Sequence, residues 1–256
     1  MAGAHEDYLS PEFIPMAHRG GALLTANLGI ENTVRAFSNA VALGYRYLET
    51  DVHATSDGTL VAFHDDDVSR VTDVAASLRE VPLREVRRLR VGGREPIPTL
   101  EELFETFPTC SFNIDIKHFS AVEPLAESIR RHRAQRRVCV GSFSRSSIRR
   151  FRALLPEVPT AVSTAGVAAM TMGTVLAGGQ VFQVPLTHPV GPVSMDIVTP
   201  KNIERIHRAG KKIHVWTVDE PTTMHRLIDW GVDGILTDRP DLLKEVLRAR
   251  GMWSTR

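Results

Sequence analysis

The sequence of 256 residues has little of what marks a secreted or membrane-spanning protein. It has only two cysteines, Cys110 and Cys139, in apolar stretches, which favours buried thiols over a disulfide and suits a reducing compartment. No run of about 18 apolar residues occurs, so no membrane span is expected. The segment from Met1 to Pro11 lacks the apolar stretch that a signal peptide needs. Together these absences predict a cytoplasmic protein.

An excess of charge of one sign is also missing. The chain has 31 Lys and Arg against 30 Asp and Glu, so no overall field attracts nucleic acid or an anionic membrane. The basic residues of segment 130–137 have no aromatic residues among them, as a platform for stacked bases would need. We therefore expect a solvated helix end here, and no nucleic-acid partner. The oligomeric state stays open.

Short apolar runs are the main feature that the sequence does have. They alternate with helix-like segments, which is typical of parallel βαβ units. Eight such units in a chain of this length predict an α/β protein with a (β/α)₈ barrel, the TIM barrel. The eight runs span Phe13–His18, Tyr47–Val52, Ser111–Lys117, Val138–Ser142, Thr160–Ser163, Val181–Pro185, Ile213–Val218 and Gly234–Thr237.

The alternation is interrupted after the second run. Asp57-Gly58 is a strong tight-turn signal, and it predicts a hairpin whose second arm runs from Thr59 to His64. The charged, irregular segment that follows, about residues 65–98, contains Gly92-Gly93. We expect a single domain over residues 1–256, with 65–98 as an insertion over one end of the barrel.

Several helix starts carry boundary signals. Asn32 is expected to cap the helix Thr33–Leu43, and Thr99 precedes a short helix with two glutamates in its first turn. Pro200 and Pro240 are expected to begin two later helices.

Polar side chains occupy one face of the second and third strands. Because residues two apart share a face, Glu49 and Asp51 lie opposite their apolar neighbours, and Asp115 does so in the third strand. The apolar sets must pack on helices, so the three carboxylates point into the barrel near the carboxyl ends of its strands. This is the face that carries active sites in such barrels.

Three carboxylates in one place repel each other, by about 4 kcal/mol per pair at ~4 Å and an effective dielectric near 20. A hard cation such as Mg²⁺ or Ca²⁺ prefers oxygen ligands and would offset this cost. The alternative is a carboxylate layer that Lys117 and Arg19 neutralise, with raised pKa values.

Two of the ten histidines differ from the rest because each ends a strand beside a charged residue. His18 ends the first strand and His64 ends the hairpin arm, so both are expected near the same mouth of the barrel. Two imidazoles beside a metal and a cationic pair indicate acid–base chemistry on a phosphate ester.

Short motifs follow one another in a fixed order from His18 to Pro240, and this ordered set resembles the glycerophosphodiester phosphodiesterase family. The motifs are His18-Arg19-Gly20, Glu31-Asn32-Thr33, Glu49-Thr50-Asp51-Val52, Asp57-Gly58, His64-Asp65, Ile114-Asp115-Ile116-Lys117, Val215-Trp216-Thr217-Val218 and Thr237-Asp238-Arg239-Pro240.

The resemblance implies a metal-dependent barrel enzyme that hydrolyses small-molecule glycerophosphodiesters to an alcohol and glycerol 3-phosphate. The attacking group is either the substrate's own 2-hydroxyl or water. The implied roles are acid–base catalysis for His18 (base) and His64 (acid), phosphate binding for Arg19 and Lys117, a wall beside the glycerol for Trp216, support for Glu31, and metal binding for Glu49, Asp51 and Asp115.

Two features depart from the family pattern. The family usually has glutamate where this chain has Asp115, so metal affinity or the preference between Mg²⁺ and Ca²⁺ is expected to differ. The segment Ala161–Gly179 is small, apolar and contains methionine. It predicts a buried helix or, alternatively, a binding surface for an acyl chain, which would make the substrate a lysophospholipid.

Two other functions fit less well. A metal-dependent amidohydrolase would need His-x-His after the first strand and histidines ending the fifth and sixth, whereas His188 is expected in a loop beyond Pro185. A barrel that only binds phosphodiesters would be favoured by the loss of a catalytic group, yet both histidines and all three carboxylates are present.

Overall fold

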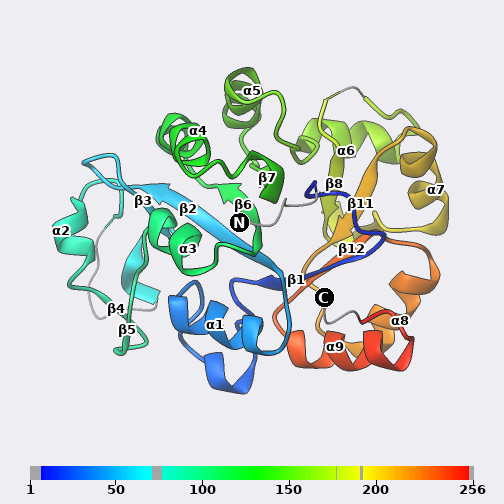
Figure 1. Cartoon of the computed structure of the whole chain (residues 1–256). Coiled ribbons are helices and arrows are strands. Elements are labelled where there is room, and N and C mark those ends of the chain that lie inside the picture. The colour runs from blue at the N-terminus through cyan, green and yellow to red at the C-terminus, as the bar shows by residue number, and fades with distance from the viewer. Residues whose placement is uncertain (1–6, 71–76, 177, 191–192, 254–256) are drawn as a thin grey trace.

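A computed structural model describes residues 7–70, 77–176, 178–190 and 193–253. In these residues seven parallel strands form a sheet in the order β7-β6-β2-β1-β12-β11-β8, and β3 extends it beside β2 (Figure 1). The strands of this path are β1 (Ile14–His18), β2 (Tyr47–Ala54), β6 (Ser111–Ile116), β7 (Val138–Gly141), β8 (Val181–Val184), β11 (Lys212–Val215) and β12 (Gly234–Thr237).

The predicted fifth strand closes this sheet with only two bridging residues. Thr160 forms a parallel bridge with Val140 of β7, and Ala161 forms one with Val181 of β8. The sheet is therefore a nearly closed parallel barrel, which confirms the predicted fold class.

Helices pack around the barrel, most of them through one apolar face (Figure 1). Two large apolar clusters lie between them and the sheet, one around β2, β6 and β7 and the other around β8, β11 and β12. The helices are α1 (Val34–Ala42), α2 (Leu83–Val86), α3 (Leu100–Thr106), α4 (Val122–Arg131), α5 (Arg145–Leu154), α6 (Thr164–Thr171), α7 (Pro200–Arg208), α8 (Pro221–Asp229) and α9 (Pro240–Ala249), with short 3₁₀ turns at η1 (Thr25–Asn27), η2 (Val68–Arg70), η3 (Phe119–Ala121) and η4 (Gln135–Arg137).

The helix starts agree with the sequence, with one exception. Thr99 caps α3 in a full capping box, and Pro200 and Pro240 begin α7 and α9. The prediction for Asn32 is wrong, because Thr33 caps α1 by accepting a hydrogen bond from the backbone of Ala36.

The predicted hairpin is present. β3 (Leu60–Ala62) pairs antiparallel with β2 in the register Val52–Ala62. The segment between β3 and α3 holds η2, α2 and the short pair β4 (Arg90–Val91) and β5 (Glu95–Pro96), which lie to one side of the β2–β3 hairpin in Figure 1. It packs around an apolar cluster of its own that includes Phe63.

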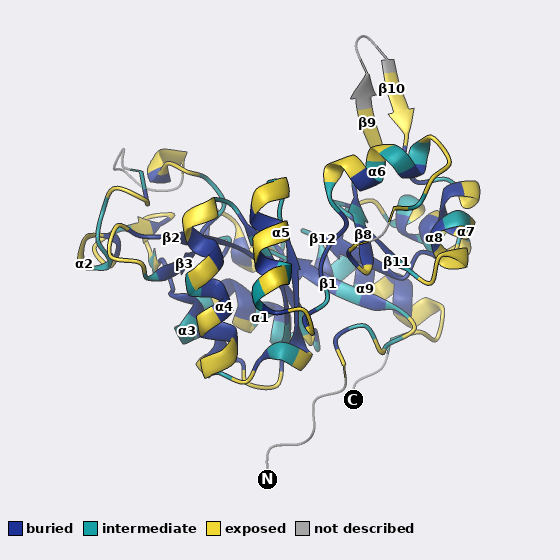
Figure 2. Cartoon of the chain, turned by 90° about the horizontal axis from the view of Figure 1, so that it is seen from above, coloured by how far each residue is buried: buried dark blue, intermediate teal, exposed yellow. Residues whose placement is uncertain are grey.

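A second hairpin was not predicted. β9 (Thr187–Val190) and β10 (Val193–Asp196) pair antiparallel and project from the molecule next to α6 (Figure 2). His188 therefore lies in a strand rather than in a loop as predicted. Among the described residues, no helix is both long enough and apolar enough to cross a bilayer.

Two further expectations concern burial. Cys110 and Cys139 are both free and buried, which confirms the interpretation of the thiols. The basic segment 130–137 is only partly solvated, because the guanidinium of Arg137 is buried over the rings of Phe104 and Phe112.

Candidate active site

A cavity of about 770 Å³ opens at the carboxyl ends of the barrel strands. Eight of the nine predicted site residues line it: His18, Arg19, Glu49, Asp51, His64, Asp115, Lys117 and Trp216. Glu31, the ninth, stands behind Arg19 and accepts a hydrogen bond from its guanidinium at 3.0 Å.

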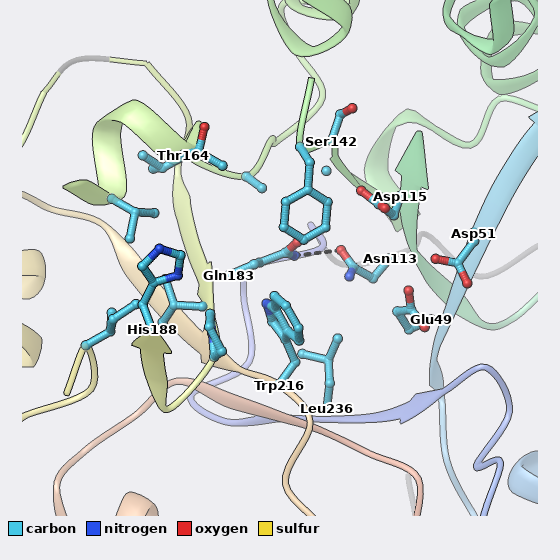
Figure 3. A pocket seen from close by; sticks show the side chains of 18 of the residues that line it. Glu49, Asp51, Asn113, Asp115, Ser142, Thr164, Gln183, His188, Trp216 and Leu236 are labelled. Carbon is cyan, nitrogen blue, oxygen red and sulfur yellow. Dashed lines mark hydrogen bonds between the residues drawn. The ribbon is translucent and has the colours of Figure 1, made fainter. Parts of the chain in front are cut away.

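The carboxylates meet because of strand register. Asp51 of β2 is the parallel partner of Asp115 of β6, and Glu49 is the partner of Asn113, while Leu48 and Val52 face the outer core. Alternation along the strands therefore turns all three carboxylates into the barrel, as the sequence predicted. Figure 3 shows the three side by side.

Two cations lie among these carboxylates. The ammonium of Lys117 bonds Asp51 at 2.7 Å and Asp115 at 2.9 Å, and Nε of Arg19 lies 3.6 Å from Asp51. The backbone N–H of Arg19 donates to Glu49 at 3.1 Å. The neutralised carboxylate layer that the sequence left open is thus present around Asp51.

The pKa values of the three acids separate according to their share of positive charge. Burial opposes ionisation of Asp51, yet Lys117 and Arg19 hold its pKa below the usual value. Burial raises the pKa of Asp115, and Lys117 opposes the rise more than any other group. Burial together with the charge of Asp51 raises the pKa of Glu49 to about 7, although His18, Arg19 and Lys117 oppose the rise. Ionisation is therefore easiest at Asp51 and is opposed at Glu49 and Asp115.

Each candidate catalytic histidine has a carboxylate on Nδ1. His18 lies 2.8 Å from Asp238, and His64 lies 2.5 Å from Asp65. A carboxylate on one ring nitrogen fixes the orientation of the imidazole and leaves the other nitrogen to the cavity. Burial alone would lower the pKa of His18, but Glu49 and Asp238 outweigh it and raise that pKa.

Two residues next to the site have left-handed backbone. Arg19 has φ 51° and Asn32 has φ 58°, and the backbone carbonyl of Arg19 accepts a hydrogen bond from the backbone N–H of Asn32 at 2.9 Å. The Asn32 amide then donates to Asp51 at 3.2 Å. Gly20 follows in the same turn with φ 84°, where an added Cβ would lie 2.9 Å from the backbone of Ala36. Such strained positions persist where the surrounding structure holds them, and here they turn Arg19 and Asn32 toward Asp51.

The cavity has a second, apolar half. Figure 3 shows Thr164 and His188 on the side away from Glu49 and Asp51, with Trp216 between the two sides. The ring of Phe143 packs edge-to-face on Trp216 at 5.9 Å. The apolar wall comes from the fifth-strand segment, α6, the end of β8 and the β9–β10 hairpin with the residue that follows it, and consists of Ala161, Val162, Ala165, Val167, Ala168, Pro185, Met195 and Ile197. Because α6 has exposed positions along this wall, the expectation of a buried helix is wrong.

Sequence reasoning missed four residues of the site. Asn113 shares the inward face with Asp115, and this alternation could have identified it. Gln183 donates to Asn113 at 2.7 Å across the cavity (Figure 3). Asp65 is the direct neighbour of His64, and this adjacency could have identified it, whereas Asp238 is 220 positions from His18 and no local pattern connects the two.

The comparisons with known proteins agree with this geometry. Residues 18–242 match the model of the glycerophosphoryl diester phosphodiesterase family. The chain belongs to this family. It is therefore an enzyme of the phosphodiesterase class, and the family's members hydrolyse glycerophosphodiesters.

Individual relatives cover nearly the whole chain. It is 39% identical to the probable glycerophosphodiester phosphodiesterase 2 of Mycobacterium tuberculosis, over 94% of this chain and 92% of the relative. It is 30% identical to a glycerophosphodiester phosphodiesterase of Caldanaerobacter subterraneus subsp. tengcongensis, over 92% and 98% of the two chains.

Solved structures have the same fold. A phosphodiesterase of Oleispira antarctica, in complex with the product sn-glycerol-3-phosphate, superposes with a TM-score of 0.77 at 23% identity. The match covers 92% of this chain and 96% of the other.

The donor set suits a divalent cation in its chemistry, although not yet in its arrangement. Glu49, Asp51 and Asp115 supply only oxygen donors, and burial raises the pKa values of Glu49 and Asp115, so a bound cation would favour their ionised forms. In the described residues, no three His, Cys, Asp or Glu side chains are placed so as to hold a metal ion. Instead, the ammonium of Lys117 bonds both aspartates.

Proposed function

We propose that this chain hydrolyses glycerophosphodiesters to an alcohol and sn-glycerol 3-phosphate, with a divalent cation and histidine acid–base catalysis. The observation that carries the proposal is the convergence of two carboxylate-backed imidazoles and three carboxylates on one cavity. The product bound to the Oleispira antarctica relative supports the same reaction.

The charges of the site support the cation. Arg19 and Lys117 face Glu49, Asp51 and Asp115, and Glu31 takes part of the charge of Arg19. An anionic phosphodiester would add to this negative surplus, so its binding needs further positive charge. Glu49, Asp51 and Asp115 would hold Mg²⁺ or Ca²⁺, which would polarise the phosphoryl oxygens. For this, Lys117 must release at least one aspartate, after which its ammonium is available to the phosphate.

The chain's own residues account for proton transfer. Arg19 and Lys117 would bind the phosphate oxygens, and Trp216 would contact the glycerol. His18, held by Asp238, would take the proton of the attacking hydroxyl, which is either the glycerol 2-hydroxyl or water. As that oxygen bonds to phosphorus, the bond to the alcohol breaks and His64 gives its proton to the leaving oxygen. If a cyclic phosphate forms, water then opens it with the two roles exchanged.

The reaction class is tested by turnover of glycerophosphocholine and glycerophosphoethanolamine, with glycerol 3-phosphate as the measured product. We expect activity to vanish in EDTA and to return with Mg²⁺ or Ca²⁺. Absence of turnover with every cation would contradict the proposal for these headgroups, and Asp115→Glu would then test whether the shorter side chain is the cause.

The histidine roles are tested by the leaving group. An activated leaving group needs no acid, so it should rescue His64→Ala but not His18→Ala. Rescue of His18→Ala alone would reverse the assignment. Trapping a cyclic glycerophosphate in either variant would identify the 2-hydroxyl as the attacking group, whereas direct incorporation of ¹⁸O without it would identify water.

A lysophospholipid is the second candidate substrate, because the apolar half of the cavity could take an acyl chain. Ala168→Phe on α6 would fill part of that half. If an acyl chain binds there, this change should lower kcat/KM for lysophosphatidylcholine at least about tenfold and leave glycerophosphocholine within about threefold, since a lost apolar contact of 1–3 kcal/mol corresponds to this range. Equal effects on the two substrates would contradict the lysophospholipid candidate.

Two expectations from the sequence stay proposals. One is that residues 1–256 make a single domain with an insertion at about 65–98. The other is a cytoplasmic location, which the two free, buried thiols support.

A further inference from the structure

Arg70 connects the insertion to the active site. It ends η2, and its guanidinium bonds two carboxylates from different parts of the chain. Nε lies 2.5 Å from Asp65, and the two terminal nitrogens lie 2.7 and 3.3 Å from the two oxygens of Glu31. A planar guanidinium can make all three contacts at once, which a lysine ammonium cannot match.

Each of these carboxylates also holds a residue of the cavity. The second oxygen of Asp65 contacts Nδ1 of His64 at 2.5 Å, and Glu31 accepts a hydrogen bond from Arg19 at 3.0 Å. A continuous series of contacts thus runs from His64 through Asp65, Arg70 and Glu31 to Arg19. Arg70 itself does not line the cavity.

We propose that Arg70 is a positioning residue that holds His64 and Arg19 in one geometry through Asp65 and Glu31. This inference rests on the proposed function, in which His64 protonates the leaving alcohol and Arg19 binds the phosphate. Through Arg70, the insertion fixes the position of the His64 imidazole relative to the Arg19 guanidinium.

Because Arg70 is exposed, its effect on activity can be measured without a large effect on stability. Its side chain is 48% exposed, and ion pairs at such positions contribute little to stability because water screens them. A fixed orientation of the groups that touch the substrate matters far more, since loss of such supporting contacts typically costs about 10–100-fold in activity.

The experiment compares Arg70→Gln and Arg70→Lys with Arg35→Gln as a matched control. Arg35 also pairs across to the insertion, with Glu95 at 2.5 Å, but it touches no residue of the site. With glycerophosphocholine as substrate, we expect both Arg70 variants to lose about 10–100-fold in kcat/KM. The control should stay within about twofold, and all three variants should have the wild-type Tm within a few degrees.

Arg70 acts on His64 through Asp65 and on Arg19 through Glu31, so the two contacts should affect kcat and KM differently. A purely structural role of Arg70 would not produce this difference. Asp65→Asn should lower mainly kcat because it frees His64, and Glu31→Gln should raise mainly KM because it frees Arg19. Arg70→Gln should change both. Since Arg70 acts on His64 through Asp65, the effects of the two substitutions should not multiply. The kcat of the double variant Arg70→Gln/Asp65→Asn should be no more than about threefold below that of the less active single variant.

Four outcomes separate this inference from the proposed function. Arg70 variants within about twofold of an active wild type would overturn the inference alone, as would losses that multiply in the double variant. If Arg70→Gln fails to fold, Arg70→Lys keeps the charge and decides the question. A wild-type protein that turns over no glycerophosphodiester would overturn the proposed function, and the inference with it.

Discussion

The imidazole of His214 lies on β11 and is fully buried, and its neighbours Ile213 and Val215 belong to the apolar cluster around β8, β11 and β12. Within the described part of the chain, neither ring nitrogen has a hydrogen-bond partner. Burial is the main cause that lowers its pKa to about 4, with Asp233 opposing and Lys212 adding to the shift. The native protein therefore keeps His214 neutral at mildly acidic pH.

This residue makes stability depend on pH. Its pKa is about 4 in the folded chain and about 6.5 when unfolded, so between pH 6.5 and pH 4 the unfolded chain binds a proton that the folded chain does not. The free energy of unfolding should therefore fall as the pH falls from 6.5 to 4, by about 3 kcal/mol, because one pKa unit corresponds to about 1.36 kcal/mol. Urea unfolding at several pH values measures the fall, and His214→Gln should remove this part of it.

The control for that measurement is His225→Gln on the half-buried surface of α8. It replaces a histidine outside the apolar interior, so a slope that is reduced only in His214→Gln assigns the effect to the buried ring. Equal slopes in the wild type and in His214→Gln would show that His214 is not held neutral by burial.

Individual residues were predictable from the sequence where their role follows from alternation along one strand. Glu49, Asp51 and Asp115 are such residues. Asn32 is not, because its contact with Asp51 depends on a φ of 58° that no local pattern reports. Asp238 is not either, because its partner His18 is 220 positions away in the chain.

At the level of elements, α3 has the most complete start signal. The hydroxyl of Thr99 accepts from the backbone of Glu102, and the Glu102 side chain accepts from the backbone of Thr99. Thr99→Ala should lower the free energy of unfolding by about 1 kcal/mol, because it leaves a helix N–H without its acceptor. Thermal unfolding should show a Tm about 2–4 °C lower.

The matched control is Thr222→Ala, on the exposed face of the first turn of α8. It should change stability by less than about 0.5 kcal/mol. A Thr99→Ala variant as stable as this control would mean that tertiary packing alone holds the start of α3.

The elements show where sequence patterns stop being informative. All eight predicted strands lie at their places in the barrel. The fifth has only two bridging residues, one paired with β7 and the other with β8. The β9–β10 hairpin was not predicted, since Pro189 and Pro192 lie within the segment and indicate a loop. Arg137 was assigned to water because charge alone does not reveal the rings of Phe104 and Phe112 beneath it.

For the whole molecule, the balance of charge inside the barrel links stability to the reaction. The overall net charge is +1, yet the polar half of the cavity holds more carboxylates than cations. The apolar clusters on both sides of the barrel must offset the repulsion between Glu49 and Asp51 in the cation-free protein. A cation bound there should therefore stabilise the native fold as well as the transition state.

We therefore expect Glu49→Gln to raise the stability of the cation-free protein and to reduce the stabilisation that a cation provides. A cation at a free concentration of about one hundred times its dissociation constant adds ~2.7 kcal/mol to the free energy of unfolding. Mg²⁺ or Ca²⁺ should therefore raise the wild-type Tm by about 5–10 °C above its value in EDTA.

Glu49→Gln removes a carboxylate whose pKa is about 7 in the folded chain and 4.5 in the unfolded chain. Ionisation of this carboxylate at higher pH opposes folding. In EDTA at pH 8 this variant should be more stable than the wild type, by up to ~3 kcal/mol. Adding the cation should leave the Tm of Glu49→Gln nearly at its value in EDTA, because the variant lacks one of the carboxylates that would bind the cation. Differential scanning fluorimetry with and without the cation measures both effects. A Glu49→Gln variant that is less stable in EDTA yet still gains the full shift would place the cation elsewhere than on Glu49.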